Sequence, residues 1–156
     1  MSLEDDLLYR CHDFDALTTE RLYQILKIRQ KVFVVEQECA YLDCDGYDQM
    51  AHHLCGFDSK GEIISYARLL PPESKYERYA SFGRILVAEA YRGRGLGQHI
   101  TAQTIDRCQQ LFGNVPIQIM AQSYLISFYR SFGFETKGDR FLEDGIEHQL
   151  MVNDLS

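Results

Sequence analysis

The chain has 156 residues, of which 46% are hydrophobic and 25% charged, and its formal net charge is −7 at pH 7. This is the composition of a folded globular protein, and it excludes the disordered and fibrous classes. The length fits a single domain over residues 1–156, and the negative charge disfavours nucleic acid as a partner.

The cysteines indicate a reducing compartment. They are odd in number and form neither a C-x-x-C pair nor a common zinc-ligand spacing: Cys11, Cys39, Cys44, Cys55 and Cys108. No secretory signal opens the chain, and no apolar span approaches the roughly 18 to 20 residues of a membrane helix. We therefore expect free thiols, a cytoplasmic protein, no membrane contact and no bound metal.

A short strand and an amphipathic helix are expected first. Residues 7–11 form the strand, and Thr18 or Thr19 caps the helix. The apolar stripe of this helix contains Leu22, Ile25, Leu26, Val32 and Phe33. Arg29 lies on the same stripe, and a buried guanidinium is costly unless a carboxylate or carbonyl pairs with it. We therefore expect Arg29 either in a structural ion pair or at a functional cleft.

A long acidic loop is expected over residues 34–50, where the apolar periodicity ends. Its carboxylates are Glu36, Glu38, Asp43, Asp45 and Asp48. Loops of this length are often functional, as lids or substrate walls. These acids are candidate partners for Arg29, and a solvated surface is the alternative.

The middle of the chain is predicted to form three strands, a glycine turn and a helix. Residues 53–57 and 63–70 form a hairpin, and residues 80–87 form the next strand. The helix that follows the turn covers residues 96–112. Its buried stripe contains Ile100, Thr104, Cys108 and Leu111.

The last third is predicted to add a strand, a short helix and two further strands. Residues 117–122 alternate apolar and polar side chains, as a strand with two unlike faces does. Ser123 caps a helix over residues 124–132, and Gly133 ends it. The last two strands lie either side of a turn at residues 143–145. The predicted order is β-α-β-β-β-α-β-α-β-β.

The glycine turn suits an anion, because alternate glycines admit a ligand to the main chain and a helix start offers unpaired N–H groups. Its sequence is Arg92-Gly93-Arg94-Gly95-Leu96-Gly97, and Arg84 lies nearby in sequence as a further cation. A dinucleotide fingerprint needs glycine where Gln98 stands, and a P-loop needs Lys-Ser/Thr after Gly97, so neither fits. The turn resembles the R-x-x-G-x-G pyrophosphate loop of the GNAT acyl-CoA N-acyltransferases. An ordinary strand-to-helix turn is the alternative.

A second marker supports this resemblance. Residues 128–134 are Phe-Tyr-Arg-Ser-Phe-Gly-Phe and look like the F-Y-x-x-x-G-F segment of the GNAT superfamily. Residues 32–37 and 143–148 further resemble its ElaA-like branch, with Glu147 where that branch often carries proline. The predicted element order is similar to the GNAT fold, an α/β (α+β) fold around a central, mostly antiparallel sheet.

The resemblance implies one acyltransferase domain that moves an acetyl group from acetyl-CoA to a primary amine of a small molecule or peptide by direct attack. The residues implied for acetyl-CoA binding are Ile85, Leu86, Val87, Arg92, Gly93, Arg94, Gly95, Leu96, Gly97 and Tyr129. Tyr129 is implied as the general acid for the departing thiolate, with helix packing as its alternative role. A main-chain N–H of Val87 or Ala88 is implied as the oxyanion donor.

The general base and the acceptor site are less well defined. Glu36 ranks first as base because it follows the helix that carries Arg29. The other candidates are Asp48, Glu89, His52, His53 and His148. Contacts to the acceptor are expected from Arg29, Asp48 and His148.

Two other functions remain open at this point. Acyl-homoserine-lactone synthases share the GNAT core and a similar stretch around Arg29, Val32 and Phe33, so a synthase-like acyltransferase is one alternative. A non-catalytic acyl-CoA-binding sensor is the other. The protein is expected to be a monomer or a homodimer.

Overall fold

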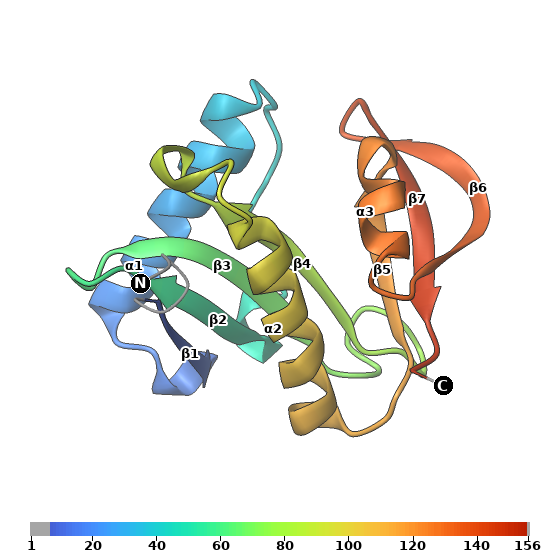
Figure 1. Ribbon diagram of the computed structural model, residues 1–156, viewed down its shortest axis with the longest axis horizontal. Coiled ribbons are helices and arrows are strands. Elements are labelled where there is room, and N and C mark those ends of the chain that lie inside the picture. Colours follow the sequence, from blue (N-terminus) through green and yellow to red (C-terminus); the bar gives the residue numbers. More distant parts are fainter. Residues whose placement is uncertain (1–6, 156) are drawn as a thin grey trace.

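The structure is a computed structural model, and it describes residues 7–155 (Figure 1). The helices are α1 (Thr19–Arg29), α2 (Leu96–Phe112) and α3 (Ile126–Arg130). The strands are β1 (Leu8–Asp13), β2 (His52–Phe57), β3 (Ile63–Leu70), β4 (Ser81–Val87), β5 (Ile117–Gln122), β6 (Glu135–Glu143) and β7 (Ile146–Asn153). This order matches the predicted β-α-β-β-β-α-β-α-β-β.

The strands form two antiparallel sheets, with the orders β1-β2-β3-β4 and β5-β7-β6. The sheets meet at a parallel bridge between Ala80 and Ile117, where Ala80 N donates to Pro116 O over 3.1 Å. Beyond this bridge, strands β4 and β5 diverge (Figure 1). The predicted central sheet is therefore split along one seam, and the split leaves space between β4 and β5.

Alternate residues of β2 and β3 pack in two different hydrophobic clusters, because successive side chains of a strand point to opposite faces of the sheet. Leu54 and Ala67 pack in the cluster that contains Ile100 of α2, while Cys55 and Tyr66 pack in the cluster that contains Ile25 of α1. Helices α1 and α2 thus cover opposite faces of the four-stranded sheet.

Helix α1 begins as predicted, since Thr18 Oγ1 accepts a hydrogen bond of 3.0 Å from Arg21 N. It does not end before the acidic segment. A π-helical stretch, Gln30–Glu36, continues it, so the expected loop starts later than residue 34. The extension holds Phe33 and Glu36 on a helical backbone beside the rest of the fold.

Helix α2 covers the predicted range and buries Ile100, Thr104 and Cys108 as expected. Leu111 was expected on the same stripe, but it lies in the last turn and is 42% exposed. Leu96 is buried instead, at the first turn, where the helix packs against the sheet. The helix therefore contacts the sheet most tightly at the end that carries the glycine turn.

Helix α3 differs from its prediction at its start. A 3-10 turn, Ser123–Leu125, precedes it, and Ser123 does not cap it, because the buried Ser123 Oγ has no hydrogen-bond partner among residues 7–155. Gly133 follows the helix with φ of +92°, a left-handed conformation that favours glycine. The helix itself ends at Arg130, earlier than the predicted Phe132, and Gly133 ends the turn that follows it.

The cysteines of the described chain are all free thiols. Within residues 7–155, no helix combines the length and the apolar character needed to cross a membrane. No group of three or more His, Cys, Asp or Glu side chains in this range is arranged to hold a metal ion.

Candidate functional site

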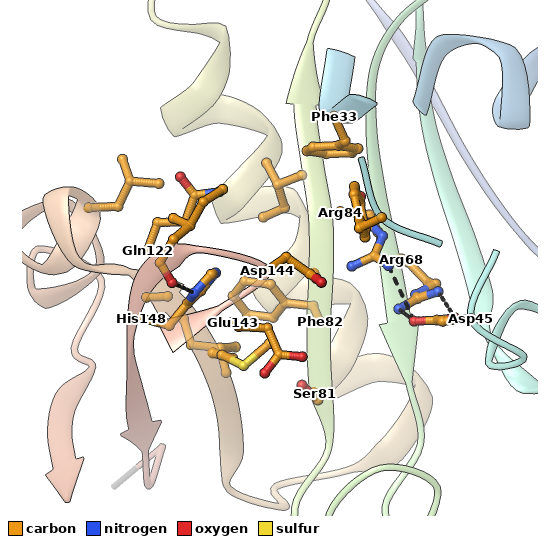
Figure 2. A pocket seen from close by; sticks show the side chains of 18 of the residues that line it. Phe33, Asp45, Arg68, Ser81, Phe82, Arg84, Gln122, Glu143, Asp144 and His148 are labelled. Atoms are coloured by element: carbon orange, nitrogen blue, oxygen red, sulfur yellow. Dashed lines mark hydrogen bonds and ion pairs between the residues drawn. The ribbon is translucent and has the colours of Figure 1, made fainter. Parts of the chain in front are cut away.

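A cavity of about 270 Å³ lies between the diverging strands β4 and β5. Its walls include Phe82 and Ile85 of β4, Gln122 of β5, Tyr129 of α3 and His148 of β7. Figure 2 shows Arg68, Arg84 and Asp45 on one side of the cavity and Gln122 and His148 on the other. Polar groups of both charges therefore converge on a space large enough for a small molecule.

The glycine turn has the geometry of an anion site. Gly93 and Gly95 both take φ of +79°, and Gly95 is the N-cap of α2 without a side-chain cap. The first N–H groups of a helix have no intrahelical acceptor, and they carry partial positive charge. A Cβ added at Gly97 would meet no heavy atom within 4 Å, so a ligand can approach the main chain there.

The expected coenzyme-binding residues differ in whether their side chains or only their main-chain atoms can contact a ligand. Leu86 is 4% exposed and Leu96 is 1% exposed, so each is restricted to main-chain contacts. Ile85 lines the cavity directly, and Arg94 is exposed, with its guanidinium 5.6 Å from the ring centroid of Tyr91. A second, more open hollow is lined by Gly95, Gln98 and His99 of the turn and α2 and by Ser131 and Phe132 beyond α3.

Arg92 is bound on both sides within the protein. Its Nε donates to Val87 O over 2.9 Å, and its Nη2 donates to Glu36 Oε2 over 2.6 Å. Glu36 does not line the cavity of Tyr129. The role of Glu36 as general base stays a prediction, and this position does not favour it, because its carboxylate is paired with Arg92 at the end of the π-helical stretch.

Arg29 is fully buried and paired, as its place on the apolar stripe predicts. Its Nε donates to Asp43 Oδ2 over 2.9 Å, its Nη1 to Asp48 Oδ1 over 2.6 Å, and its Nη2 to Asp43 O over 2.9 Å. Contact of Arg29 and Asp48 with the acceptor stays a prediction that this pairing does not favour. Neither residue lines the cavity, and Arg29 has an exposed fraction of 0%.

The pair belongs to a cluster of three arginines and three aspartates. Arg68 Nη1 donates to Asp45 Oδ1 over 2.8 Å and to Asp48 Oδ1 over 3.1 Å. Arg84 Nε donates to Asp43 Oδ1 over 2.7 Å, and Tyr41 Oη donates to Asp43 Oδ1 over 2.8 Å. The cluster fixes the loop after α1 against β3 and β4, and it forms one wall of the cavity.

Arg84 was expected in a basic patch with Arg92 and Arg94, but the structure separates it from them. Tyr66 pairs with Leu86 and Arg68 with Gly83, so Arg84 and Ile85 together lie opposite Ala67 in a β-bulge. Arg84 takes φ of +52°, which is uncommon for a residue with a side chain. The bulge directs Arg84 to the acidic cluster and the cavity.

One of the two expected oxyanion donors, the main-chain N–H of Ala88, is already hydrogen-bonded within the sheet. Ala88 N donates to Ile64 O over 2.8 Å. The N–H of Ala88 is therefore not free for a substrate oxygen, which contradicts that half of the expectation.

Tyr129 lines the cavity from α3. Its side chain is 9% exposed and packs against the rings of Phe82, Phe128 and Phe134, while its hydroxyl has no hydrogen-bond partner among residues 7–155. Burial raises the pKa of Tyr129 to about 12. The phenol is thus held in one place by its ring, and its proton is retained at neutral pH.

His148 lines the same cavity from β7. Its Nδ1 lies 2.7 Å from Ile146 O, and its ring stacks on Phe141. A carbonyl oxygen only accepts hydrogen bonds, so Nδ1 carries the proton in the neutral ring, and Nε2 keeps a free lone pair. His148 is therefore arranged to accept a hydrogen bond from a ligand.

The remaining candidate bases lie elsewhere. His53 is 1% exposed, with Nδ1 2.6 Å from Tyr66 Oη and Nε2 2.9 Å from Asp48 O, so both ring nitrogens are occupied. Burial lowers the pKa of His53 and keeps it neutral. His52 packs on Phe112, and neither His52 nor Glu89 lines the cavity.

The architecture and the glycine turn agree with a known family model. Residues 20–155 match the model of the acetyltransferase (GNAT) domain. The chain belongs to the GNAT acetyltransferase family. Relatives of this chain include a UPF0039 protein of Synechocystis, 42% identical over 139 residues, which cover 89% of this chain and 90% of the relative. Protein ElaA of Escherichia coli is 37% identical over 141 residues, which cover 89% of this chain and 91% of ElaA.

Solved structures of GNAT proteins superpose closely on this chain. An acyl-CoA N-acyltransferase from Pseudomonas aeruginosa does so with a TM-score of 0.90 at 34% identity, over 94% of this chain and 99% of that one. The E. coli ElaA crystal structure has a TM-score of 0.86 at 34% identity, over 94% and 99% of the two chains. The expected ElaA-like branch and the α/β fold are thereby confirmed.

The acyl-homoserine lactone synthase BjaI also shares this fold. Its structure with SAM and isopentyl-CoA has a TM-score of 0.78 at 15% identity, over 96% of this chain and 84% of BjaI. Identity this low supports a common fold alone.

Proposed function

We propose that residues 1–156 form one acyltransferase domain that moves the acetyl group of acetyl-CoA to a primary amine of a small molecule or peptide. The observation that carries the proposal is the position of Tyr129. Its ring lines the cavity between β4 and β5 and is held by the rings of Phe82 and Phe134, and its hydroxyl has no hydrogen-bond partner among residues 7–155. An unpaired phenol in a shaped cavity is the group that a departing thiolate requires.

The coenzyme side rests on the glycine turn. The N-terminus of α2, Gly93 and Gly95 in left-handed conformations, and the open space over Gly97 suit a pyrophosphate. Arg92 and Arg94 add positive charge around it. Ile85 connects this turn to the cavity along β4, so an acyl group attached to the coenzyme has a path towards Tyr129.

In the proposed reaction, a neutral amine attacks the thioester carbon. A C–N bond forms, the C–S bond breaks, and the CoA sulfur leaves as a thiolate that takes the proton of Tyr129. His148 Nε2 accepts the proton that the amine loses, and exchange with water restores both side chains. This assignment replaces Glu36 with a residue that lines the cavity and whose Nε2 makes no hydrogen bond among residues 7–155.

The raised pKa of Tyr129 sets a condition on this step. A phenol with a pKa of about 12 is a weaker acid than a free phenol near 10, and a free thiol has a pKa of about 8.5. Burial also destabilises a thiolate. Tyr129 is therefore an effective donor only to sulfur that is released within the same buried space.

The protonation state of the acceptor also matters. At pH 7 an α-amine with a pKa near 8 is neutral in roughly one molecule in ten, but a lysine ε-amine near 10.4 in only about one in two thousand. A weak base such as an imidazole suffices for the first kind of amine. The proposed acceptors are therefore α-amines before ε-amines.

A thiol-release assay with acetyl-CoA and a panel of amines, peptides and polyamines tests the proposal. Amine-dependent release supports it, with the acetylated product identified by mass spectrometry. Acetyl-CoA binding without release for any amine would support the non-catalytic sensor instead. Release only with S-adenosylmethionine and a longer acyl-CoA would support the synthase-like alternative.

A further inference from the structure

The cavity carries charges that the proposed transfer chemistry does not use. Three cations line it, Arg68, Arg84 and Lys75, together with the carboxylates of Asp45, Glu143 and Asp144. Asp45 is paired with Arg68 and Arg84. The other carboxylates and Lys75 make no ion pair among residues 7–155. The cavity therefore holds unmatched charges of both signs.

The unmatched positive charge lies on the wall formed by β3, β4 and the segment between them. Arg29, Arg68 and Arg84 are balanced by Asp43, Asp45 and Asp48, so this six-residue cluster is neutral as a whole. Lys75 adds a cation that makes no ion pair among residues 7–155, although the charges of Asp45 and Glu143 act on it. Arg84 uses Nε and Nη2 for Asp43 and Asp45, which leaves the donors of Nη1 without a partner in residues 7–155.

Lys75 is held at this wall by a structured turn. Ser74 Oγ donates to Pro71 O over 2.6 Å, and Glu73 N donates to Tyr76 O over 3.0 Å. The ammonium lies 5.6 Å from the ring centroid of Tyr76. Burial, and then the charges of Arg68 and Arg84, lower the pKa of Lys75, and together they outweigh the opposing charges of Asp45 and Glu143. An anion beside Lys75 would relieve this repulsion.

The unmatched negative charge lies on the turn between β6 and β7. Glu143 is the last residue of β6, and Asp144 follows it in the turn. The turn contacts the loop after α1 through Cys39 Sγ and Asp144 O at 3.7 Å. These carboxylates suit an ammonium group that has not yet lost its proton. A ligand that pairs with the cations of one wall and the carboxylates of the other must carry both a negative and a positive charge.

We propose that the acceptor is a primary amine that also carries a carboxylate, as an amino acid does, and that Lys75 and Arg84 bind this carboxylate. The inference rests on the proposed transferase function and narrows its acceptor class. Polyamines are excluded as preferred acceptors, because their second ammonium would meet Lys75 and Arg84. A carboxylate fits the free Nη1 donors of Arg84 and the ammonium of Lys75 through charge-assisted hydrogen bonds.

The test compares acceptors that differ only by the carboxylate. Leucine is paired with isopentylamine, phenylalanine with 2-phenylethylamine, and lysine with cadaverine, all with acetyl-CoA. Because an amino acid and its matched amine differ in amine pKa, kcat/KM is calculated for the neutral amine in each case. On this basis we expect kcat/KM for the best amino acid to exceed that of its matched amine by roughly tenfold or more. Equal or better transfer to the amines would overturn the inference and leave the transferase proposal standing. β-Alanine and 2-aminoethyl phosphate form a further pair, and a preference for the phosphate would overturn the choice of a carboxylate.

Variants of Lys75 test whether the preference for amino acids over amines depends on the cavity wall that carries Lys75 and Arg84. Lys75→Met should lower the ratio of kcat/KM between amino acid and matched amine by about tenfold, and Lys75→Glu should shift preference towards cadaverine. Lys60→Met, at an exposed lysine in the turn between β2 and β3, is the matched control and should keep the ratio. An unchanged ratio in folded Lys75→Met and Lys75→Glu would overturn the inference.

A binding measurement separates failure of the inference from failure of the proposed function. Ligand-observed NMR compares N-acetyl-leucine with N-isopentylacetamide on wild-type protein, without turnover. One outcome would overturn the transferase proposal and leave the carboxylate site standing. In that outcome no amine is acetylated, N-acetyl-leucine still binds more tightly than N-isopentylacetamide, and Lys75→Met removes this difference in binding. Equal binding of both compounds would overturn the anion-binding role of Lys75 and Arg84.

Discussion

Arg92 Nη2 lies 2.6 Å from Glu36 Oε2, so the arginine expected to contact the coenzyme phosphates is already paired with a carboxylate. The pair joins the glycine turn to the end of the π-helical stretch that extends α1. Arg92 remains 45% exposed at its side chain, so phosphate oxygens can reach it while the pair persists. Glu36 therefore both positions Arg92 and opposes the binding of an anion.

Glu36→Gln should strengthen acetyl-CoA binding. Removal of the carboxylate takes one negative charge away from the proposed phosphate site while the amide can still accept a hydrogen bond from Arg92. We expect a Kd lower by roughly two- to fivefold at low salt, measured by calorimetry, with a smaller change at high salt. Glu38→Gln is the matched control. Weaker binding in Glu36→Gln would show that positioning of Arg92 outweighs repulsion.

Gly95→Asp should weaken acetyl-CoA binding. The substitution places a carboxylate at the N-terminus of α2, where the pyrophosphate is proposed to lie. Gly61→Asp is a close control, because Gly61 has φ of +80° and Gly95 has φ of +79°, and a Cβ at either position meets no heavy atom within 4 Å. Both variants share the backbone strain, but only Gly95→Asp should raise Kd by about tenfold or more. Equal affinity in the two folded variants would contradict the proposed site.

Tyr129→Phe should lower the single-turnover rate with little effect on acetyl-CoA affinity. The ring contacts with Phe82 and Phe134 are kept, but the proton for the thiolate is lost. A general acid contributes roughly 10² to 10⁴ in rate, so a loss of this size is expected in rapid-quench measurements. Tyr124→Phe, at a tyrosine that is 75% exposed, is the control. If Tyr129→Phe keeps more than about half of the native rate, Tyr129 serves only in packing.

Asp45 should make the stability depend on pH in acid. Burial raises the pKa of Asp45, but hydrogen bonds and charge from Arg68, with a smaller effect of Arg84, outweigh it and bring the pKa to about 2. Because the folded pKa lies below the unfolded value near 3.9, the stabilisation is complete above about pH 4 to 5 and is lost as the pH falls towards 2.

Urea unfolding from pH 6 to pH 2 measures this effect. Between pH 5 and 2, the wild type should lose about 1 to 2 kcal/mol more than Asp45→Asn in free energy of unfolding, because the amide cannot be protonated in this range. Asp15→Asn, at an exposed position, should retain the wild-type pH dependence. Parallel curves for wild type and Asp45→Asn would contradict the assignment.

Arg29→Met should destabilise the fold strongly. The change leaves Asp43 and Asp48 without their shared cation, and both carboxylates are at most 9% exposed. Breaking a buried ion pair by removing one partner costs about 3 to 5 kcal/mol, which urea unfolding measures directly. Arg10→Met on the exposed face of β1 is the control. The double variant Arg29→Met/Asp48→Asn should recover part of the loss, and strict additivity would argue against the pair.

The sequence by itself determined the order of the elements and the glycine turn. Both depend on neighbours in the chain: the helical and strand periods of apolar side chains, and the left-handed conformations that Gly95 and Gly133 adopt at helix ends. The burial of Arg29 with an acidic partner was also predictable. Its place on the apolar stripe of α1 forces it into the core, and a buried guanidinium requires a carboxylate.

Only the tertiary structure decided which side chains meet. Arg84 lies 41 residues from Asp43 in the chain, and a bulge in β4 directs it to the cavity rather than to Arg92 and Arg94. Glu36 meets Arg92 because the π-helical stretch continues past the predicted end of the helix. Such pairs depend on strand register and on how separate elements pack, and neither leaves a periodic signal in the sequence.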